Sequence, residues 1–357
     1  MANAETRLGD INGQETGLSF TPSYSLMLTE VYQGQKELIS NLTPDFDYFG
    51  QCLHYCFWTW GDVWLILGFA VIWTILRYVL TWSIYQPFYR RLKLDEEDEA
   101  KAPESSFKSI WYMCSWTYCC YILFFKGNNI FQEPRLIFAD WHVGMTVPYD
   151  IYIIYMYQLG FYIHSIYATL YMDHKRKDFL MMLVHHVLTI LLLGISYLVR
   201  YHKIGLLVLF CHDLTDVCLE CGKMFIYTKK RDGQSHQINE VLANVCFAGF
   251  TLTWILLRLY WFPLKALYAA GAYTIDSMPY VTTFNIMLWI LQIMNIYWFS
   301  FIVTMLFRLL LGKADELSDI REETEEFLNQ QKLKQKGSGD ALSNGVENNA
   351  VYSKKDN

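Results

Sequence analysis

Long apolar stretches of about 20 residues alternate with short polar connections along most of the chain. An α-helix needs about this many mainly apolar residues to cross a bilayer, so each stretch predicts a transmembrane helix. The stretches cover residues 61–82, 107–126, 149–172, 179–199, 204–228, 240–262 and 281–311. The pattern therefore predicts an all-α polytopic membrane protein with seven transmembrane helices, of which the second is the least apolar.

Basic residues indicate how such a bundle is oriented, because they gather in cytosolic connections. They follow the first, third, fifth and seventh stretches, as Arg90, Arg91, Lys93 and Lys101, then Lys175, Arg176 and Lys177, then Lys229, Lys230 and Arg231, then Arg308 and Lys313. These groups share one side of the membrane only if the chain crosses it seven times. The N-terminus is therefore predicted to be lumenal and the C-terminus cytosolic.

Two short motifs agree with this orientation. Asn41 begins an Asn-Leu-Thr sequon and is a glycosylation candidate on the lumenal side. Lys354 and Lys355 form a dilysine pattern near the cytosolic end, typical of retrieval to the endoplasmic reticulum. We therefore expect a multi-pass protein of the endoplasmic reticulum membrane. Its predicted parts are a lumenal tail (1–60), a first transmembrane helix (61–82), a cytosolic linker (83–106), a domain of six helices (107–311) and a cytosolic, largely disordered tail (312–357).

Composition narrows the function further. The chain is 53% hydrophobic and 18% charged, with a formal net charge of −6. Nucleic-acid-binding domains normally carry a basic face, so no nucleic-acid partner is expected. Most cysteines lie inside the apolar stretches, which argues against a disulfide framework. The polar N-terminal region also lacks the pattern of a cleavable signal peptide.

Ionisable side chains inside a bilayer are costly and therefore indicate function. The fourth and fifth stretches hold nearly all of them, namely His185 and His186 on the fourth and His212, Asp213, Asp216 and Glu220 on the fifth. At 100° per residue the four on the fifth stretch fall on one face of the helix. The connection between the two stretches is very short, so the helices are predicted to be antiparallel and adjacent.

One interpretation of these groups is that they only hold the helices together. The number of ionisable groups instead favours catalysis, with His185, His186, His212, Asp213 and Asp216 as candidates. A histidine can act as a general base, or it can accept an acyl group as an acyl-imidazole. Asp213 or Asp216 would orient it. Glu220 and Thr189 are candidate substrate-binding residues. No metal is expected.

The stretch from about 107 to 311 resembles the TLC (TRAM–LAG1–CLN8) domain, and Met182 to Tyr227 resembles the ceramide synthase signature within it. The residues that carry the likeness are the His185-His186 pair, the His212-Asp213-x-x-Asp216 pattern and Leu219-Glu220, with further likeness in Met294–Phe299 and Asp315–Glu322. The resemblance implies a bundle of the second to seventh helices around a lipid tunnel. It also implies that one histidine of the pair, His185 rather than His186, accepts the acyl group.

The resemblance implies a sphingoid base N-acyltransferase that joins a long-chain fatty acyl-CoA to sphinganine or sphingosine. Acyl-CoA would be a substrate, with no cofactor, and the enzyme would contact membrane lipids and form homodimers or heterodimers with related synthases. Only about 24 residues separate the first two stretches. This resembles the animal member without a homeobox-like domain, which prefers stearoyl-CoA. The connection at 263–280 lies where the family is associated with chain-length choice.

Three other classes of protein could carry buried histidines and carboxylates in a membrane bundle. A non-enzymatic TLC protein, such as a lipid sensor or trafficking factor, would share the bundle but would not require both the paired histidines and the acidic helix. A metal-dependent lipid hydroxylase or desaturase would need many more histidines than the nine in this chain. A proton-coupled transporter would also use buried carboxylates, but no paired broken helices are evident.

Overall fold

The computed structural model describes residues 21–40, 50, 54–274 and 278–311. Most of these residues are helical, with one short hairpin. The elements are α2 (Tyr24–Ser40), α4 (Trp60–Leu80), η1 (Thr81–Tyr85), α5 (Gln86–Leu92), α6 (Glu96–Cys120), η2 (Tyr121–Phe125), η3 (Pro134–Ile137), α7 (Tyr149–Tyr171), α8 (Phe179–Leu198), α9 (His202–Tyr227), β1 (Lys230–Arg231), β2 (Gln234–Ser235), α10 (Gln237–Thr253), η4 (Trp254–Leu267), α11 (Tyr268–Ala272) and α12 (Val281–Leu310).

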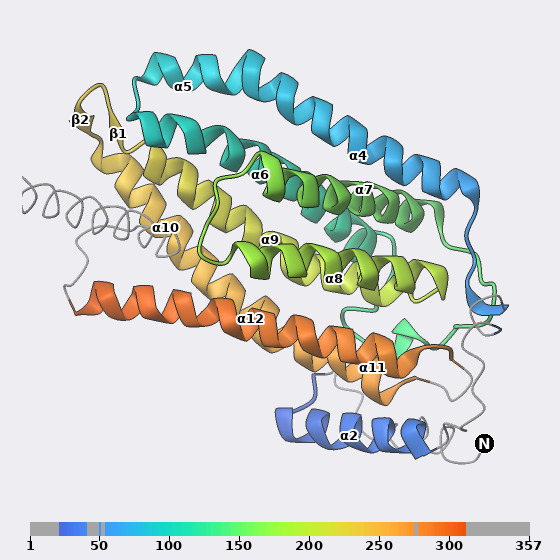
Figure 1. Cartoon of the computed structure of the whole chain (residues 1–357). Helices are drawn as coiled ribbons and strands as arrows, with labels where there is room; N and C mark the ends of the chain where they lie inside the picture. The colour runs from blue at the N-terminus through green and yellow to red at the C-terminus, as the bar shows by residue number, and fades with distance from the viewer. Residues whose placement is uncertain (1–20, 41–49, 51–53, 275–277, 312–357) are drawn as a thin grey trace, which may run out of the picture.

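The long helices lie side by side in an elongated bundle, with α4 along one edge and α12 along the other (Figure 1). Helix α9 is the centre of this arrangement, because it packs against α6, α8, α10 and η4. Helix α4 packs mainly on α7. The described residues therefore confirm an all-α architecture, and α8 and α9 are neighbours as the short connection predicts.

Apolar sequence and local caps explain the long helices. Helix α4 begins with a reciprocal cap, in which the Asp62 backbone N–H donates to the Thr59 hydroxyl and the Thr59 N–H donates to the Asp62 carboxylate. Four acidic residues occupy the first turn of α6, where they face the positive end of the helix dipole. This start extends α6 well before residue 107, so much of the predicted linker 83–106 is helical.

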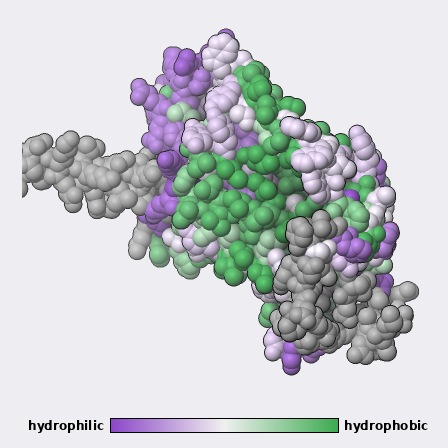
Figure 2. All heavy atoms as spheres, turned by 45° about the vertical axis from the view of Figure 1, so that its right-hand side comes forward, coloured by the Kyte–Doolittle hydropathy of each residue, from purple (hydrophilic) through white to green (hydrophobic). Residues whose placement is uncertain are grey.

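Four helices of the described part are long and apolar enough to cross a membrane: Trp60–Leu92, Phe179–Leu198, Gln237–Ala272 and Val281–Leu309. The predicted spans 107–126, 149–172 and 204–228 are helices too, but they are more polar and do not meet the same criterion. Figure 2 shows hydrophobic residues over the middle of the bundle and hydrophilic ones toward its ends. The protein is thus an all-α membrane protein, and the number of seven spans remains a prediction.

The hairpin lies at the end of the bundle that carries the predicted cytosolic connections. There Lys93 pairs with Asp232 at 2.7 Å, and the Asp232 N–H donates to the Lys93 carbonyl. These contacts join the turn between α5 and α6 to the turn of the hairpin. Figure 1 shows the same end, where α5, β1, β2 and the start of α10 lie close together.

Helix α2 packs alongside α11, toward the opposite end of the bundle (Figure 1). Its Met27 and Val31 pack against Leu264 and Tyr268. A side-chain carbon at Gly34 would lie only 2.3 Å from the backbone oxygen of Gly271, so this contact requires glycine. The predicted glycosylation candidate Asn41, the dilysine pattern and the tail from 312 onward lie outside the described residues.

Candidate functional site

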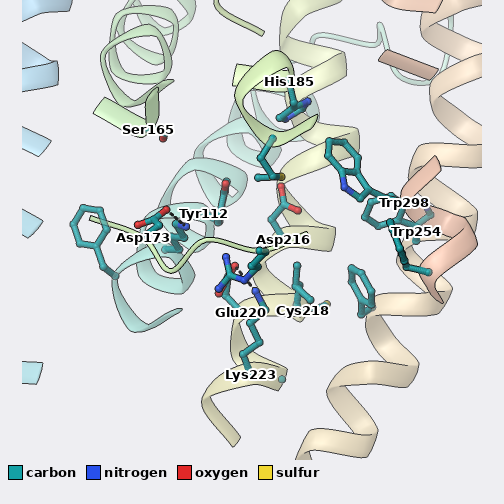
Figure 3. A pocket seen from close by; sticks show the side chains of 18 of the residues that line it. Tyr112, Ser165, Asp173, His185, Asp216, Cys218, Glu220, Lys223, Trp254 and Trp298 are labelled. Atoms are coloured by element: carbon teal, nitrogen blue, oxygen red, sulfur yellow. Dashed lines mark hydrogen bonds and ion pairs between the residues drawn. The ribbon is translucent and has the colours of Figure 1, made fainter. Parts of the chain in front are cut away.

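A cavity of about 180 Å³ lies within the bundle, between the end of α4 and helices α6, α7, α8, α9, α10, η4 and α12. Its lining residues come from the parts of these helices nearest the predicted cytosolic connections. In Figure 3, His185, Asp216, Glu220 and Lys223 follow one another along the cavity, with Trp254 and Trp298 on one side and Asp173 on the other. Residues from the fourth and fifth predicted spans therefore meet in one cavity, as expected from the sequence.

The two histidines sit on α8 within an aromatic setting. The His185 ring lies 5.3 Å from the Trp298 ring, edge to face at 88°. Tyr162 lies beside both histidines, at 6.4 Å from His185 and 6.0 Å from His186. His186 is buried, whereas His185 is only partly buried. Both line the cavity, and His185 is the more accessible of the two.

One ring nitrogen of each histidine makes no hydrogen bond within the described residues. Among the described residues, Nδ1 of His185 and Nδ1 of His186 are buried without a hydrogen-bond partner. Buried polar atoms are nearly always hydrogen-bonded in folded proteins, so two unpaired nitrogens next to a cavity suggest a missing partner. A substrate or a water molecule would supply it. This pair is the strongest chemical feature of the site.

The position of Trp298 is fixed by a hydrogen bond to the residue that precedes α8. Its indole N–H donates to the Asp178 carboxylate at 2.9 Å, and both residues are buried. Asp178 directly precedes α8, so this bond ties α12 to the start of the helix that carries His185. The contact fixes the ring against which His185 packs. The sequence pattern did not single out Asp178, because it lies in a short connection.

The acidic residues of α9 do not all reach the cavity. Asp216 and Glu220 line it together with His185 and His186. Asp213 is fully buried toward α6 and α7, where the Ser115 hydroxyl donates to it at 2.5 Å and the Gln158 amide at 3.0 Å. An arc of 100° on a central helix faces several neighbours, so residues that share a face can point to different partners.

His212 and Thr189 are also held by other contacts. The ring of His212 is hydrogen-bonded at both nitrogens, to the Val208 carbonyl at 2.7 Å and to the Asn295 amide at 3.1 Å. The hydroxyl of Thr189 donates to the His185 carbonyl at 2.8 Å. Neither residue is among those that line the cavity. Of the predicted set, the structure therefore brings together His185, His186, Asp216 and Glu220, and it places His212, Asp213 and Thr189 outside the cavity lining.

Arg258 is a cavity residue that the sequence pattern did not single out. Its Nη2 donates to Asp216 at 2.7 Å and to the His212 carbonyl at 3.0 Å. Its guanidinium also stacks over Trp254, 4.1 Å from the ring centroid. A single arginine inside the apolar stretch 240–262 was the signal that would have identified it, since such residues seldom occur without a partner in a membrane helix.

A charge cluster occupies the end of the cavity nearest the predicted cytosolic connections. It consists of Arg77, Glu104, Lys108, Asp173 and Arg176. Lys108 bonds both carboxylates, at 2.7 Å to Glu104 and 2.8 Å to Asp173. Arg176 lies 3.2 Å from Glu104, and Arg77 pairs with Asp173. Beside the cluster, Lys223 lies 3.5 Å from Glu220.

The cations of the cluster lower the pKa values of its two carboxylates. Burial raises the pKa of Glu104, but the charges of Lys108 and Arg176 outweigh it and hold the pKa well below its ordinary value. For Asp173, burial likewise raises the pKa, and Lys108 and Arg77 lower it more. Both carboxylates therefore remain ionised at neutral pH. The cluster is a buried network of mutually paired charges.

The described residues contain no group of three or more His, Cys, Asp and Glu side chains that could hold a metal ion. The arrangement instead offers a pair of unpaired imidazole nitrogens, an arginine–carboxylate pair beside them and an aromatic wall. Imidazoles in such a setting can serve as nucleophiles or general bases. The bundle and site define a helical membrane protein with a histidine-based intramembrane site.

Comparison with known proteins names the family. The TLC domain model matches residues 101–304. Ceramide synthase 1 of Mus musculus is 44% identical over 242 residues, which cover 67% of this chain and 69% of that protein. Ceramide synthase 1 of Homo sapiens is 45% identical over the same length. Ceramide synthase LOH2 of Arabidopsis thaliana is 34% identical over 232 residues, 61% of this chain and 74% of that protein.

The chain belongs to the ceramide synthases, a family of TLC-domain enzymes. This confirms the resemblance carried by the paired histidines and the acidic helix. It argues against the non-enzymatic, metal-dependent and transporter alternatives considered from the sequence.

Proposed function

We propose that the protein is a sphingoid base N-acyltransferase, which transfers the acyl group of a long-chain acyl-CoA to the amine of sphinganine or sphingosine. The observation that carries the proposal is the His185–His186 pair, whose Nδ1 atoms are buried beside the cavity without a partner among the described residues. Membership of the ceramide synthase family supports the same reaction. No cofactor is needed, because the thioester is already activated.

His185 is the proposed acyl acceptor, because it is less buried than His186 and contacts Trp298. Its unprotonated ring nitrogen attacks the thioester carbonyl carbon, and the carbon–oxygen π electrons move to oxygen. When the carbonyl reforms, the carbon–sulfur bond breaks and coenzyme A leaves as a thiolate, which takes up the proton that the other ring nitrogen of His185 loses. The product of this half-reaction is an acyl-imidazole.

The sphingoid amine then attacks the acyl-imidazole carbon. The carbon–nitrogen bond to His185 breaks and the amide forms, while the amine gives up a proton to a neighbouring base, which passes it to the departing ring nitrogen of His185. His186 is the proposed base, since it lies beside His185 with an unpaired nitrogen of its own. In a one-step variant of the reaction, His185 would act as the general base without accepting the acyl group.

The carboxylates take different proposed roles. Asp216 lines the cavity and accepts a hydrogen bond from Arg258. It is the carboxylate proposed to orient the catalytic groups. Glu220 lines the cavity further along and is proposed to bind the sphingoid amine. The contacts of Asp213 with Ser115 and Gln158, and those of His212 with Val208 and Asn295, favour structural roles for these two. Thr189 remains a proposed substrate-binding residue. It lies one turn after His185 on α8, and its hydroxyl donates to the His185 carbonyl.

The membrane setting is also part of the proposal. Seven spans, a lumenal N-terminus, a cytosolic C-terminus and residence in the endoplasmic reticulum would place the charge cluster on the side where acyl-CoA is dissolved. The apolar lining formed by residues such as Phe250, Ile302 and Met305 would begin a tunnel for the acyl chain. Stearoyl-CoA is the proposed donor. Dimers with itself or with related synthases complete the proposal.

An acyl transfer assay tests the reaction. Membranes from cells that lack their own ceramide synthases, expressing the full chain, are supplied with sphinganine and a panel of acyl-CoAs. Dihydroceramide formation is expected, with the highest rate for stearoyl-CoA, and is expected to disappear in His185→Ala and His186→Ala at matched expression. Absence of product from well-expressed wild-type protein across the whole panel would refute the proposed activity.

A further inference from the structure

Arg258 is the one cavity-lining cation of η4 among the described residues, and it stands apart from the charge cluster. It is only 4% exposed, within a helix that is otherwise apolar around it. A buried arginine costs stability unless its charge and its N–H groups are satisfied. Its position therefore requires an explanation, either as a structural ion pair or as part of the chemistry.

The contacts of Arg258 hold its guanidinium in place but leave one N–H donor without a partner in the described part of the chain. Both of its hydrogen bonds, to Asp216 and to the His212 carbonyl, are made by Nη2. Trp254 fixes the plane of the guanidinium from one side. Within the described part of the chain, Nε of Arg258 is buried without a hydrogen-bond partner. An unpaired buried donor of a charged group is expensive, and a ligand oxygen would remove that cost.

The location of this donor matches a need of the reaction. Arg258, Asp216 and His185 line the same cavity. The cations of the charge cluster are already bonded to Glu104 and Asp173 at the cavity end. Of the cations that line the cavity, Arg258 alone has a buried nitrogen without a partner among the described residues.

We propose that Arg258 is a catalytic residue that stabilises the oxyanion formed when a thioester carbonyl is attacked at the histidine pair. This rests on the proposed acyl transfer. In the attack, a bond forms between the histidine nitrogen and the carbonyl carbon, and the carbonyl π pair becomes the negative charge on oxygen. Arg258 donates an N–H to that oxygen, and the pair returns to the carbonyl as the bond to sulfur breaks. Asp216 and Trp254 act as positioning residues that hold the guanidinium before substrate arrives.

The test measures the first half-reaction by itself. Purified full-length protein is mixed with stearoyl-CoA in the absence of a sphingoid base, and coenzyme A release in a single turnover is followed by rapid quench. Arg258→Lys keeps the charge but loses the fixed fork of donors. Its acylation rate is expected to fall by about 10²–10³-fold, with stearoyl-CoA binding and the melting temperature close to those of the wild type. Lys265→Arg is the matched control, a buried cation swap on the same helix outside the cavity lining, and is expected to acylate at the wild-type rate.

A double variant separates chemistry from ion pairing. Arg258→Gln with Asp216→Asn removes both charges, so neither is left buried without its partner. If Arg258 only neutralises Asp216, the double variant regains wild-type acylation, and that result would overturn the proposal. The proposal predicts that it stays at least 10²-fold slow. A wild-type rate in Arg258→Lys, or a loss of binding and melting temperature that accounts for its whole defect, would overturn it as well. A wild type that releases no coenzyme A would instead refute the acyl transfer itself.

Discussion

Two regions of the same cavity differ in whether their polar side chains are paired. In the charge cluster, Lys108 bonds to both Glu104 and Asp173, and Arg77 and Arg176 complete the network. Further along, His185 and His186 keep ring nitrogens that have no partner among the described residues. Fully paired groups stabilise a fold but offer nothing to a substrate, whereas unpaired groups cost stability and are available for reaction. The contrast separates the structural end of the cavity from its proposed reactive part.

The largest expected effect comes from the reactive part. Replacing His185 by Ala removes the proposed acyl acceptor, so dihydroceramide formation is expected to fall by at least about 10³-fold. Turnover is measured with stearoyl-CoA and sphinganine on protein of matched amount. His142→Ala, at an exposed histidine outside the cavity, is the control and is expected to remain active. A turnover within a few-fold of wild type in His185→Ala would show that His185 is not the acyl acceptor.

The two aspartates of α9 offer a sharper test, because they lie three residues apart on one helix but meet different neighbours. Asp216→Asn weakens the hold on Arg258, so turnover is expected to fall by about 10²-fold, the scale of a misplaced catalytic group. Asp213→Asn leaves the cavity lining unchanged, and its main expected effect is a lower melting temperature. Steady-state turnover and the melting temperature are measured for both variants and compared. Equal losses of turnover at matched stability would mean that the cavity does not distinguish the two residues.

A smaller effect is expected where a residue acts through its contact with His185. Trp298→Phe keeps a ring against the imidazole but loses the hydrogen bond to Asp178. A decrease in kcat of about 10-fold is expected, with little change in KM, since the imidazole would be less firmly positioned. Asp178→Asn should reproduce it, because the same bond is weakened. If kcat is unchanged in both variants, this bond does not position His185.

The smallest effect on turnover is expected from the charge cluster, although its effect on stability is large. Glu104→Gln leaves Lys108 and Arg176 without a buried counter-charge, which typically costs about 3–5 kcal/mol. A clearly lower melting temperature is expected, with turnover per folded molecule within a few-fold of wild type. The pKa of Glu104 is lowered in the folded state, so its contribution to stability is present above the ordinary carboxyl pKa and is lost as the pH falls below it.

Glu99→Gln is the matched control for the cluster, because its pair with Arg90 lies at the surface. Exposed pairs contribute little, so this variant is expected to melt close to the wild-type temperature. Equal melting of the Glu104 and Glu99 variants would show that the buried network is not structural.

Much of the fold follows from the hydrophobic pattern. The predicted span 179–199 corresponds to α8 at Phe179–Leu198, and 204–228 corresponds to α9 at His202–Tyr227. The meeting of His185 with Asp216 and Glu220 follows from the short connection between these helices. Periodicity could not separate Asp213 from Asp216, because it gives an angle around the helix but not which neighbour lies there.

The rest of the site depends on tertiary contacts. The members of the charge cluster come from the end of α4, from α6, and from the connection after α7, so no local pattern links Arg77, Glu104 and Asp173. The same holds for the bond between Trp298 and Asp178, which joins residues 120 positions apart. Arg258 was visible as a lone charge in an apolar stretch, but its partners were not.

The proposed acyl transfer can be tested directly by locating the acyl group on the protein. Full-length protein is incubated with stearoyl-CoA without a sphingoid base, digested, and analysed by peptide mass spectrometry over residues 179–198. We expect a stearoyl group on His185, which is lost on addition of sphinganine as dihydroceramide appears. An active enzyme that carries the acyl group on another residue, or that never carries one under these conditions, would contradict the proposed role of His185.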